Sequence, residues 1–350
     1  MSKANPSIVP QREERSREVS SPVVSGEMRL RVCHVLPGPQ DPQRMVFANE
    51  QISSLTAWGV VNRTVFLQSR TCPLVVVREA LRLRGEIQDF RPHVVHAHYG
   101  TVTAMITALC ASAPLVITFR GSDLNPCPSI SPIRSALGRL LSHLAAYRAA
   151  GIICVSADLK RRLWRSGSGI RIISTGIDCS IFQPASRDVA REELGWPAGR
   201  PVVLFNAGDD PLVKRRDLAL AAVAAARALS LDFDFVELNG TIPHARVPAY
   251  LNAADCLLVT SDWEGSPNIV KEAIACALPV VTVDVGDVRE RLAGVKPSYI
   301  VERSPLAIAR GLGEILRHPC RSNGPETIAD LSSGSIAKQL VAVYREVVRA

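Results

Sequence analysis

The stretch SDWEGSPNIVKEAIACALPVVTVDVGDVRE, at residues 261–290, decides the fold of the second half of the chain. It follows the apolar run DCLLVT and is typical of a strand end, a loop, a helix, a strand and a glycine turn, in that order. We predict Ser266 as the N-cap of the helix and Pro267 as its first residue, since serine caps well and proline suits that position. The helix can bury one face, because apolar residues recur at helical spacing at Val270, Ala273, Ile274 and Ala277.

Two glutamates in this stretch, Glu264 and Glu272, are separated by seven residues. Glu264 falls in the loop, and Glu272 falls in the second turn of the expected helix. The free backbone N–H groups across 266–268 then face the carboxyl edge of the sheet, where an anion binds well. Two carboxylates beside such an anion site predict a sugar and a ribose held next to a phosphate group.

Length and composition indicate a globular protein of two domains. The chain has 350 residues, of which 47% are hydrophobic and 21% charged. Its nine cysteines form no CxxC pair, which favours reduced thiols over disulfides or a zinc site. Residues 1–27 are polar, so we expect a disordered tail and no signal peptide. The apolar region 101–119 is broken by Pro114, so we expect no membrane crossing and a cytoplasmic protein.

Strand patterns alternate with helical patterns from residue 30 onward. In the first half, strands are expected at 31–36, 61–67, 93–98, 114–119 and 151–156. A second series follows Pro197, with strands at 201–208, 233–240, 255–260 and 279–284. This alternation predicts an α/β fold of two Rossmann-like halves, whose parallel sheets face each other across a cleft. The last segment, 331–350, is expected to be a helix, and the sequence leaves open whether it packs back on the first half.

Five further blocks accompany the opening stretch in a fixed order: PHVVHAHYG (92–100), TFRGSDL (118–124), CVSADLKRRL (154–163), STGIDCSIFQP (174–184) and KRRDLALAA (214–222). With these blocks the chain resembles the family 4 glycosyltransferases, retaining enzymes of the GT-B fold, over roughly residues 30 to 345. It is most similar to the bacterial branch that makes cell-surface polysaccharides, such as teichuronic acid. The resemblance implies an acceptor domain at 28–185 and a nucleotide-sugar donor domain at 186–330.

The resemblance also implies roles for individual residues. Sugar transfer from a nucleotide diphosphate sugar would retain the anomeric configuration, and we expect no obligatory metal. Glu264 would contact the donor-sugar hydroxyls, and Glu272 would bind the ribose. Lys214 corresponds to the family's basic residue at the diphosphate, where a cation stabilises the charge on the leaving group. Backbone groups facing the sugar and diphosphate would come from Gly265, Ser266, Pro267 and Asn268.

Several positions depart from the family pattern. Many relatives have an arginine six residues before the lysine, where this chain has Gly208. The missing charge could come from Arg215, Arg216 or Arg120. The last of these stands where relatives often have a histidine, and arginine can bind phosphate but cannot act as a base.

Other polar residues near the predicted cleft have two interpretations each. His98 and Asp123 follow neighbouring strands, so each is either a site residue or a structural one, and Asp123 could be a helix N-cap. Asn239 and Gly240 are expected on the nucleotide side of the cleft. The turn at 286–287 either reaches the donor or only caps a helix. The loop at 37–44 lacks the paired glycines of many relatives, so its contacts stay unassigned.

One motif suggests a metal site that we do not expect. Asp232-Phe233-Asp234 has the DxD form of the metal-binding motif in another glycosyltransferase fold. Both aspartates would lie on one side of a strand, remote from the blocks described above.

The partners are predicted from charge and patterning. Residues 1–185 hold 22 Lys and Arg against 12 Asp and Glu, whereas residues 186–350 hold 19 against 21. A predicted helix at 131–149 mixes leucines with arginines, and 158–167 adds four basic residues and Trp164. Such a helix either lies on an anionic membrane, here the inner face of the cell membrane, or packs on its sheet with a polar face in water.

We therefore expect a nucleotide sugar and a glycan or lipid-linked acceptor as partners, and no nucleic acid. Two other functions stay open at this point. One is a nucleotide-sugar 2-epimerase of the same architecture, and the other is a degenerate transferase subunit without catalysis.

Overall fold

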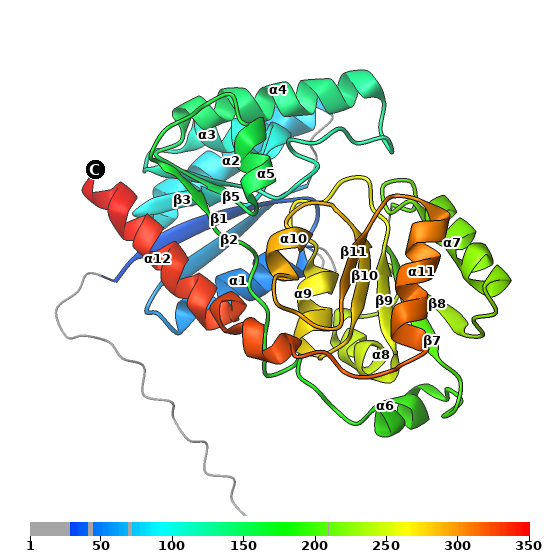
Figure 1. Ribbon diagram of the computed structural model, residues 1–350. Helices are drawn as coiled ribbons and strands as arrows, with labels where there is room; N and C mark the ends of the chain where they lie inside the picture. Colours follow the sequence, from blue (N-terminus) through cyan, green and yellow to red (C-terminus); the bar gives the residue numbers. More distant parts are fainter. Residues whose placement is uncertain (1–28, 41–44, 69–71, 209) are drawn as a thin grey trace, which may run out of the picture.

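The computed structural model describes residues 29–40, 45–68, 72–208 and 210–350 and contains two α/β units side by side (Figure 1). The expected tail at 1–27 and part of the first loop lie outside these residues. The first unit has a parallel sheet in the order β2-β1-β3-β4-β5-β6. Its strands are β1 (Arg31–Pro37), β2 (Val61–Leu67), β3 (Val94–Ala97), β4 (Leu115–Phe119), β5 (Gly151–Cys154) and β6 (Ile170–Ile172).

Helices cover both faces of this sheet. They are α1 (Val46–Thr56), α2 (Pro73–Phe90), α3 (Thr101–Cys110), α4 (Pro132–Arg148) and α5 (Ala157–Arg162). The strand order reverses at β1, which lies between β2 and β3. A reversal of this kind opens a crevice at the carboxyl ends of the strands.

The second unit has a five-stranded parallel sheet in the order β11-β10-β9-β7-β8, which reverses at β7. Its strands are β7 (Val202–Gly208), β8 (Asp234–Asn239), β9 (Cys256–Val259), β10 (Val280–Val283) and β11 (Tyr299–Val301). Its helices are α6 (Arg187–Leu194), α7 (Arg216–Ala228), α8 (Val247–Ala253), α9 (Asn268–Ala275), α10 (Val288–Arg291) and α11 (Pro305–Leu316), with short 3-10 turns η1 (His244–Arg246), η2 (Gly324–Thr327) and η3 (Ala329–Leu331). The two reversals place both crevices at the junction of the units.

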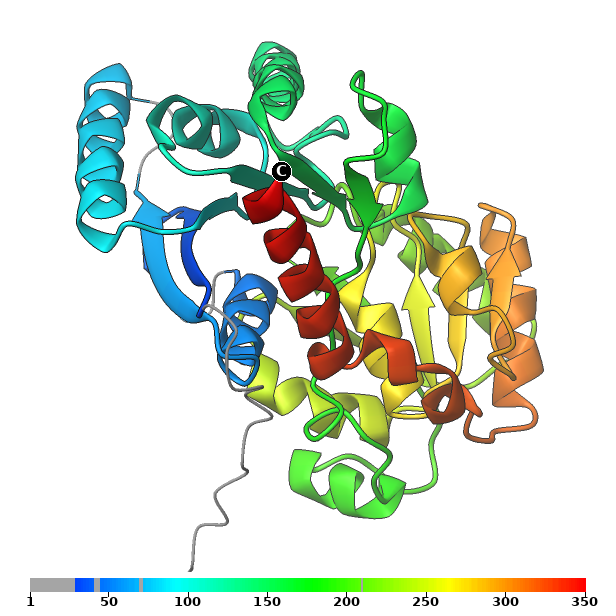
Figure 2. The same ribbon diagram turned by 90° about the vertical axis from the view of Figure 1, so that its left-hand side faces the viewer.

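Helix α12 (Ser333–Arg349) leaves the second unit and packs on the sheet of the first (Figure 2). Its apolar face, which includes Leu340, joins the core beneath β1 and β3. Tyr344 is fully buried there, with its hydroxyl 2.6 Å from Nδ1 of His96. The segment that leads back to the first unit runs beside the segment that leads from the first unit to the second. Ser333 in the returning segment donates its N–H to the carbonyl of Ile177 in the outgoing one. The chain therefore crosses between the units twice, along adjacent paths.

Most of the expected strands and helices are present, with small shifts at their ends. The strand expected at 93–98, for example, is β3 and runs from Val94 to Ala97. Strands β6 and β11 have three residues each, too few for a periodic pattern, and were not predicted. In the described part of the chain, no helix combines the length and apolarity that a membrane span requires.

Candidate active site

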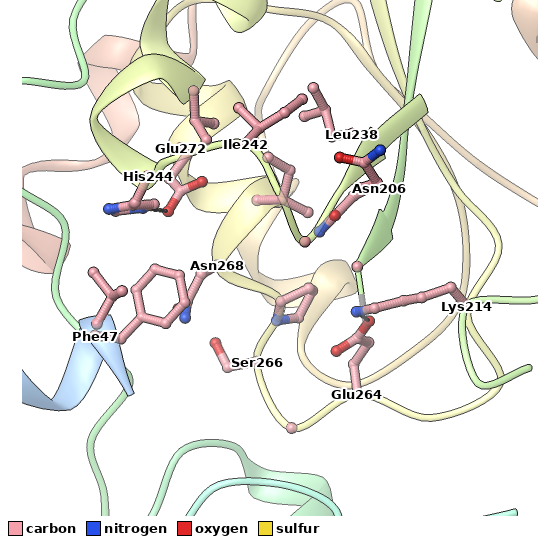
Figure 3. A pocket seen from close by; sticks show the side chains of 18 of the residues that line it. Phe47, Asn206, Lys214, Leu238, Ile242, His244, Glu264, Ser266, Asn268 and Glu272 are labelled. Carbon is pink, nitrogen blue, oxygen red and sulfur yellow. Dashed lines mark hydrogen bonds and ion pairs between the residues drawn. The ribbon is translucent and has the colours of Figure 1, made fainter. Parts of the chain in front are cut away.

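A cavity of about 410 Å³ lies between the two units and is lined from both (Figure 3). The second unit supplies most of the wall, from the ends of β7 and β8 and from the loop and first turns that lead into α9. The first unit contributes Arg120 after β4 and Phe47 on α1. The wall residues that sequence reasoning proposed are Arg120, Gly208, Lys214, Asn239, Gly240, Glu264, Gly265, Ser266, Pro267, Asn268 and Glu272.

Lys214 and Glu264 face each other at one end of the cavity (Figure 3). Lys214 Nζ lies 2.5 Å from Glu264 Oε1, and Ser261 Oγ donates to the same oxygen at 2.8 Å. Both ionic side chains are largely but not fully buried. Because the carboxylate is held by two donors, its orientation toward the cavity is fixed, while the lysine can exchange partners with an incoming anion.

The missing arginine at position 208 has a backbone explanation. Gly208 has a φ of +52°, and a Cβ there would lie 3.4 Å from Cε of Lys214. That distance is an ordinary contact, but a residue other than glycine would be strained in that backbone conformation.

Two of the three proposed substitutes for that charge are engaged elsewhere. Arg215 pairs with Asp217 and Asp262, and Arg216 pairs with Glu237. Neither lines the cavity. Among the described residues, Arg120 is therefore the arginine that joins Lys214 in the cavity wall.

The start of helix α9 differs from the prediction. Pro267 is the N-cap, the helix begins at Asn268, and no side chain caps it, so the prediction of Ser266 as the N-cap was wrong. The Ser266 hydroxyl instead donates to Oδ2 of Asp287 and bonds the hydroxyl of Ser174. The loop is thus fixed from both units. Asn268 and Ile269, in the first turn of α9, line the cavity, and the N–H groups of a first turn have no partner further along their own helix.

The two units approach each other very closely at Gly265. A Cβ at this position would lie 1.8 Å from the backbone oxygen of Arg120, which is far too close for any side chain. Gly286 packs on the other side of the same loop, with a φ of +60°, and its Cβ would lie 3.1 Å from the oxygen of Gly265. The turn at 286–287 therefore packs against the loop, and Asp287 occupies the N-cap position of α10 without a side-chain capping bond.

Arg120 is held by neutral groups of the first unit. It donates to the carbonyl of His98 at 3.0 Å, to Oγ1 of Thr175 at 3.2 Å and to Oε1 of Gln51 at 2.9 Å. Burial lowers its pKa to about 10, so it still carries its charge at neutral pH. No carboxylate among the described residues forms an ion pair with it, so its charge is available to an anion in the cavity.

His98 lies behind Arg120 and does not line the cavity. Its Nδ1 accepts from Arg120 at 3.2 Å, so its proton is on Nε2, which donates to Nδ1 of His34 at 2.9 Å. His34 in turn donates to Oδ1 of Asn62 at 2.9 Å. His98 is therefore placed to position the guanidinium.

The rings of His34, His96 and His98 could be mistaken for a metal site, because their ring nitrogens lie within 4.8 Å of one another. Burial keeps their pKa values below the usual range, so the three rings are neutral. Every ring nitrogen already has a partner, since those of His96 bond Tyr344 and Thr118. This complete network, with an arginine donating into it, favours hydrogen bonding over metal ligation.

Asp123 is a structural acceptor in this arrangement. It is fully buried and accepts the N–H groups of Gly100, Arg120 and Gly121. Burial raises its pKa, and these N–H groups oppose that rise. Its carboxylate fixes the loop that carries Arg120.

The DxD motif lies away from the cavity. Asp232 and Asp234 both pair with Arg200, and neither lines the cavity.

Sequence reasoning missed His244, Asn206 and Lys271. His244 bonds Glu272 across the cavity wall, but nothing in the sequence around it marks that role. Lys271 is fully buried and donates to Ser174 Oγ and to the carbonyl of Thr175, and burial lowers its pKa to about 7. It was overlooked because a lysine on a helix is usually solvated.

Comparisons with known proteins indicate the family and the fold. The family model Glycosyltransferase Family 4 matches residues 31–181, and the model Glycosyl transferases group 1 matches residues 195–318. The putative teichuronic acid biosynthesis glycosyltransferase TuaC of Bacillus subtilis is 25% identical over 288 residues, covering 75% of this chain and 72% of that protein. Both family models describe glycosyltransferases, which favours transfer over epimerisation.

Two solved structures establish the same fold. The sucrose-phosphate synthase of Thermosynechococcus elongatus has a TM-score of 0.71 at 17% identity, covering 91% of this chain and 99% of the other. Anabaena HepE in complex with UDP-glucose has a TM-score of 0.65 at 16% identity, covering 91% and 98%. Both family models match in order along the chain, one in each α/β unit, and together they span most of it. The chain therefore belongs to the family 4 glycosyltransferases, enzymes of the GT-B fold that use nucleotide sugars as donors.

Proposed function

We propose that the protein is a retaining glycosyltransferase that acts on a lipid-linked or polysaccharide intermediate of bacterial cell-surface glycan synthesis. The observation that carries this proposal is the meeting of Lys214, Glu264 and Glu272 in one cavity beside the start of α9. The relative TuaC, whose name places it in teichuronic acid biosynthesis, supports this class of acceptor.

In the proposed mechanism, the acceptor hydroxyl attacks the anomeric carbon from the face that the nucleotide leaves. The new C–O bond forms as the bond to the β-phosphate oxygen breaks, and the hydroxyl proton passes to that departing oxygen. Lys214, Arg120 and the first N–H groups of α9 stabilise the charge that grows on the diphosphate. Glu264, oriented by Ser261, accepts from hydroxyls of the donor sugar.

The ribose site provides the first test. Replacing Glu272 by alanine removes the acceptor for the ribose diol, and the dissociation constant of the donor is expected to rise by about tenfold or more. Isothermal titration calorimetry with UDP-, ADP- and GDP-sugars measures it, after a thermal-shift screen has selected the base. Unchanged affinity in the variant would overturn the ribose assignment. In a separate incubation of the wild-type protein with the donor alone, a change in the donor sugar would indicate an epimerase.

We further propose that helix α4 brings the enzyme to an anionic membrane. The helix turns small and polar residues such as Ser142 and Ala145 inward, and it leaves its large apolar residues in water. Ile133 is 83% exposed and Leu137 53%, and the stripe continues through Leu140, Leu144 and Tyr147. Arg134, Arg139 and Arg148 lie on the same helix. An exposed apolar stripe flanked by arginines is typical of a helix that lies in the headgroup region.

Flotation with vesicles tests this surface. The wild-type protein is expected to float with phosphatidylglycerol vesicles at low salt and to be released by salt, because arginines supply part of the attraction. Replacing both Leu137 and Leu144 by glutamate should reduce the bound fraction about tenfold. Replacing the exposed Val189 of α6 by glutamate is the matched control and should change nothing. Equal binding by the double variant, or no binding by the wild type, would contradict the proposal.

A further inference from the structure

His244 joins the two units at the ribose end of the cavity. It belongs to the short turn η1 after β8, in the second unit, and its ring reaches toward helix α9 (Figure 3). Its Nε2 lies 2.9 Å from Oε1 of Glu272, and its Nδ1 lies 3.2 Å from Oε1 of Glu50. Glu50 is on α1 of the first unit, so one ring spans the gap between the units.

The geometry sets the charge of this ring. Ionised carboxylates only accept hydrogen bonds, so both ring nitrogens must carry a proton when both contacts form. His244 is then an imidazolium between two carboxylates. Burial, the largest single influence, lowers its pKa, but the hydrogen bonds and charges of Glu272 and Glu50 outweigh it and raise the pKa to about 10.

The ring is also fixed by packing. Phe47 of α1 meets it edge-on, with ring centroids 5.0 Å apart, and Phe182 of the connecting segment lies 5.2 Å away at a tilt. The side chain is only 19% exposed, and Glu272 is 4% exposed. A cation held this firmly fixes the orientation of the carboxylate that it contacts.

We propose that His244 is a positioning residue for the donor. It holds one oxygen of Glu272, so that the carboxylate meets the ribose diol, and it ties that carboxylate to Glu50 on α1. Ribose binding and the closed arrangement of the two units thereby support each other. The inference rests on the proposed role of Glu272 as the ribose anchor, and it adds a link from that anchor to the acceptor half of the enzyme.

The test compares a ribonucleotide with an analogue that lacks the diol. The probes are the tightest-binding of UDP, ADP and GDP, and the 2′,3′-dideoxy form of the same nucleotide, both measured by calorimetry at pH 7. The wild-type protein is expected to bind the ribonucleotide at least about tenfold more tightly. His244→Gln removes the charge and one of the two contacts, so this ratio should fall to about threefold or less.

Two further variants separate the bridge from general effects. Glu50→Gln lies in the first unit and is expected to lower the ratio to an intermediate value, because the ring then has one ionised partner. Glu86→Gln makes the same chemical change in an ion pair with Arg63 that is exposed to a similar degree, and it should keep the wild-type ratio. The wild-type protein and the three variants should bind the dideoxy nucleotide with the same affinity. This equal affinity would also show that each variant is folded.

Other outcomes would contradict either the proposed function or the positioning role of His244. A wild-type ratio near one would show that Glu272 is not the ribose anchor. No binding of either nucleotide by the wild-type protein would contradict the proposed function itself, because the cavity would then not be a donor site. A normal wild-type ratio that His244→Gln leaves unchanged would overturn the positioning role alone. Equal weakening of both nucleotides in His244→Gln would assign the residue a purely structural role and would also overturn the inference.

Discussion

Replacing Lys214 by alanine is expected to lower kcat by about two to three orders of magnitude, the usual effect of removing one group that stabilises transition-state charge. The lysine faces the cavity, where it pairs with Glu264 at 2.5 Å. Its charge matters most when the nucleoside diphosphate departs and gains negative charge, so the effect should fall on kcat more than on KM. Release of the nucleoside diphosphate measures it.

Arg216→Ala is the matched control for this variant. Arg216 lies two residues further on, pairs with Glu237 and does not line the cavity. Its loss should leave turnover within about twofold, as is usual for an exposed ion pair. Near wild-type turnover of Lys214→Ala would contradict the catalytic assignment of the lysine. The alternative of a subunit without catalysis would be supported instead if the wild-type protein bound a nucleotide sugar but showed no turnover.

Replacing Gly265 by alanine is expected to lower kcat/KM by about a hundredfold, because small misplacements of reacting groups cost that much. The new methyl group would lie 1.8 Å from the backbone oxygen of Arg120, and neither backbone can yield without moving its unit. The two units must then separate, which pulls Arg120 away from Lys214. The methyl group would also lie 3.0 Å from Cγ2 of Val155, a core residue of the first unit, but that contact is with a side chain that can shift, so the thermal unfolding midpoint should change less than the activity.

Gly85→Ala is the control for the added methyl group. Gly85 lies on α2, and a Cβ there meets no atom within 4 Å. Alanine is also the better helix former, so full activity and equal or higher stability are expected. If Gly265→Ala keeps full activity, the close approach of the two units is not required for transfer.

The sequence was most informative where the chemistry depends on spacing along one element. Glu264 and Glu272 lie on a loop and on the helix that it enters, so their spacing along the chain determines how they lie relative to each other. Lys214 was assigned through the resemblance, because it corresponds to the family's basic residue at the diphosphate. All three line the cavity.

Prediction failed where a side chain is recruited from a distant segment. His244 reaches Glu272 across 28 residues, and Glu50 comes from the other unit, so no local pattern could pair them. Arg215 belongs to the block KRRDLALAA, directly after Lys214. Two aspartates, one of them on a loop 47 residues away, nevertheless hold its side chain outside the cavity. The cap at α9 was misplaced because the Ser266 hydroxyl bonds Asp287 and Ser174, which are also remote in the chain.

The exposed face of α4 shows a further limit. Its leucines and arginines fit both a membrane-binding helix and a helix packed on a sheet, because the two patterns look alike in sequence. In the structure the leucines of the stripe are exposed, and serine and alanine take the inner face against α3.

A crystal structure with a bound nucleoside diphosphate tests the central claim most directly. The account predicts that the ribose diol donates to Glu272, with His244 still on the same carboxylate, and that Lys214 has turned from Glu264 toward the β-phosphate. The diphosphate should also meet the first N–H groups of α9. A nucleotide bound outside this cavity, or bound with its ribose away from Glu272 and its phosphates away from Lys214, would contradict the account.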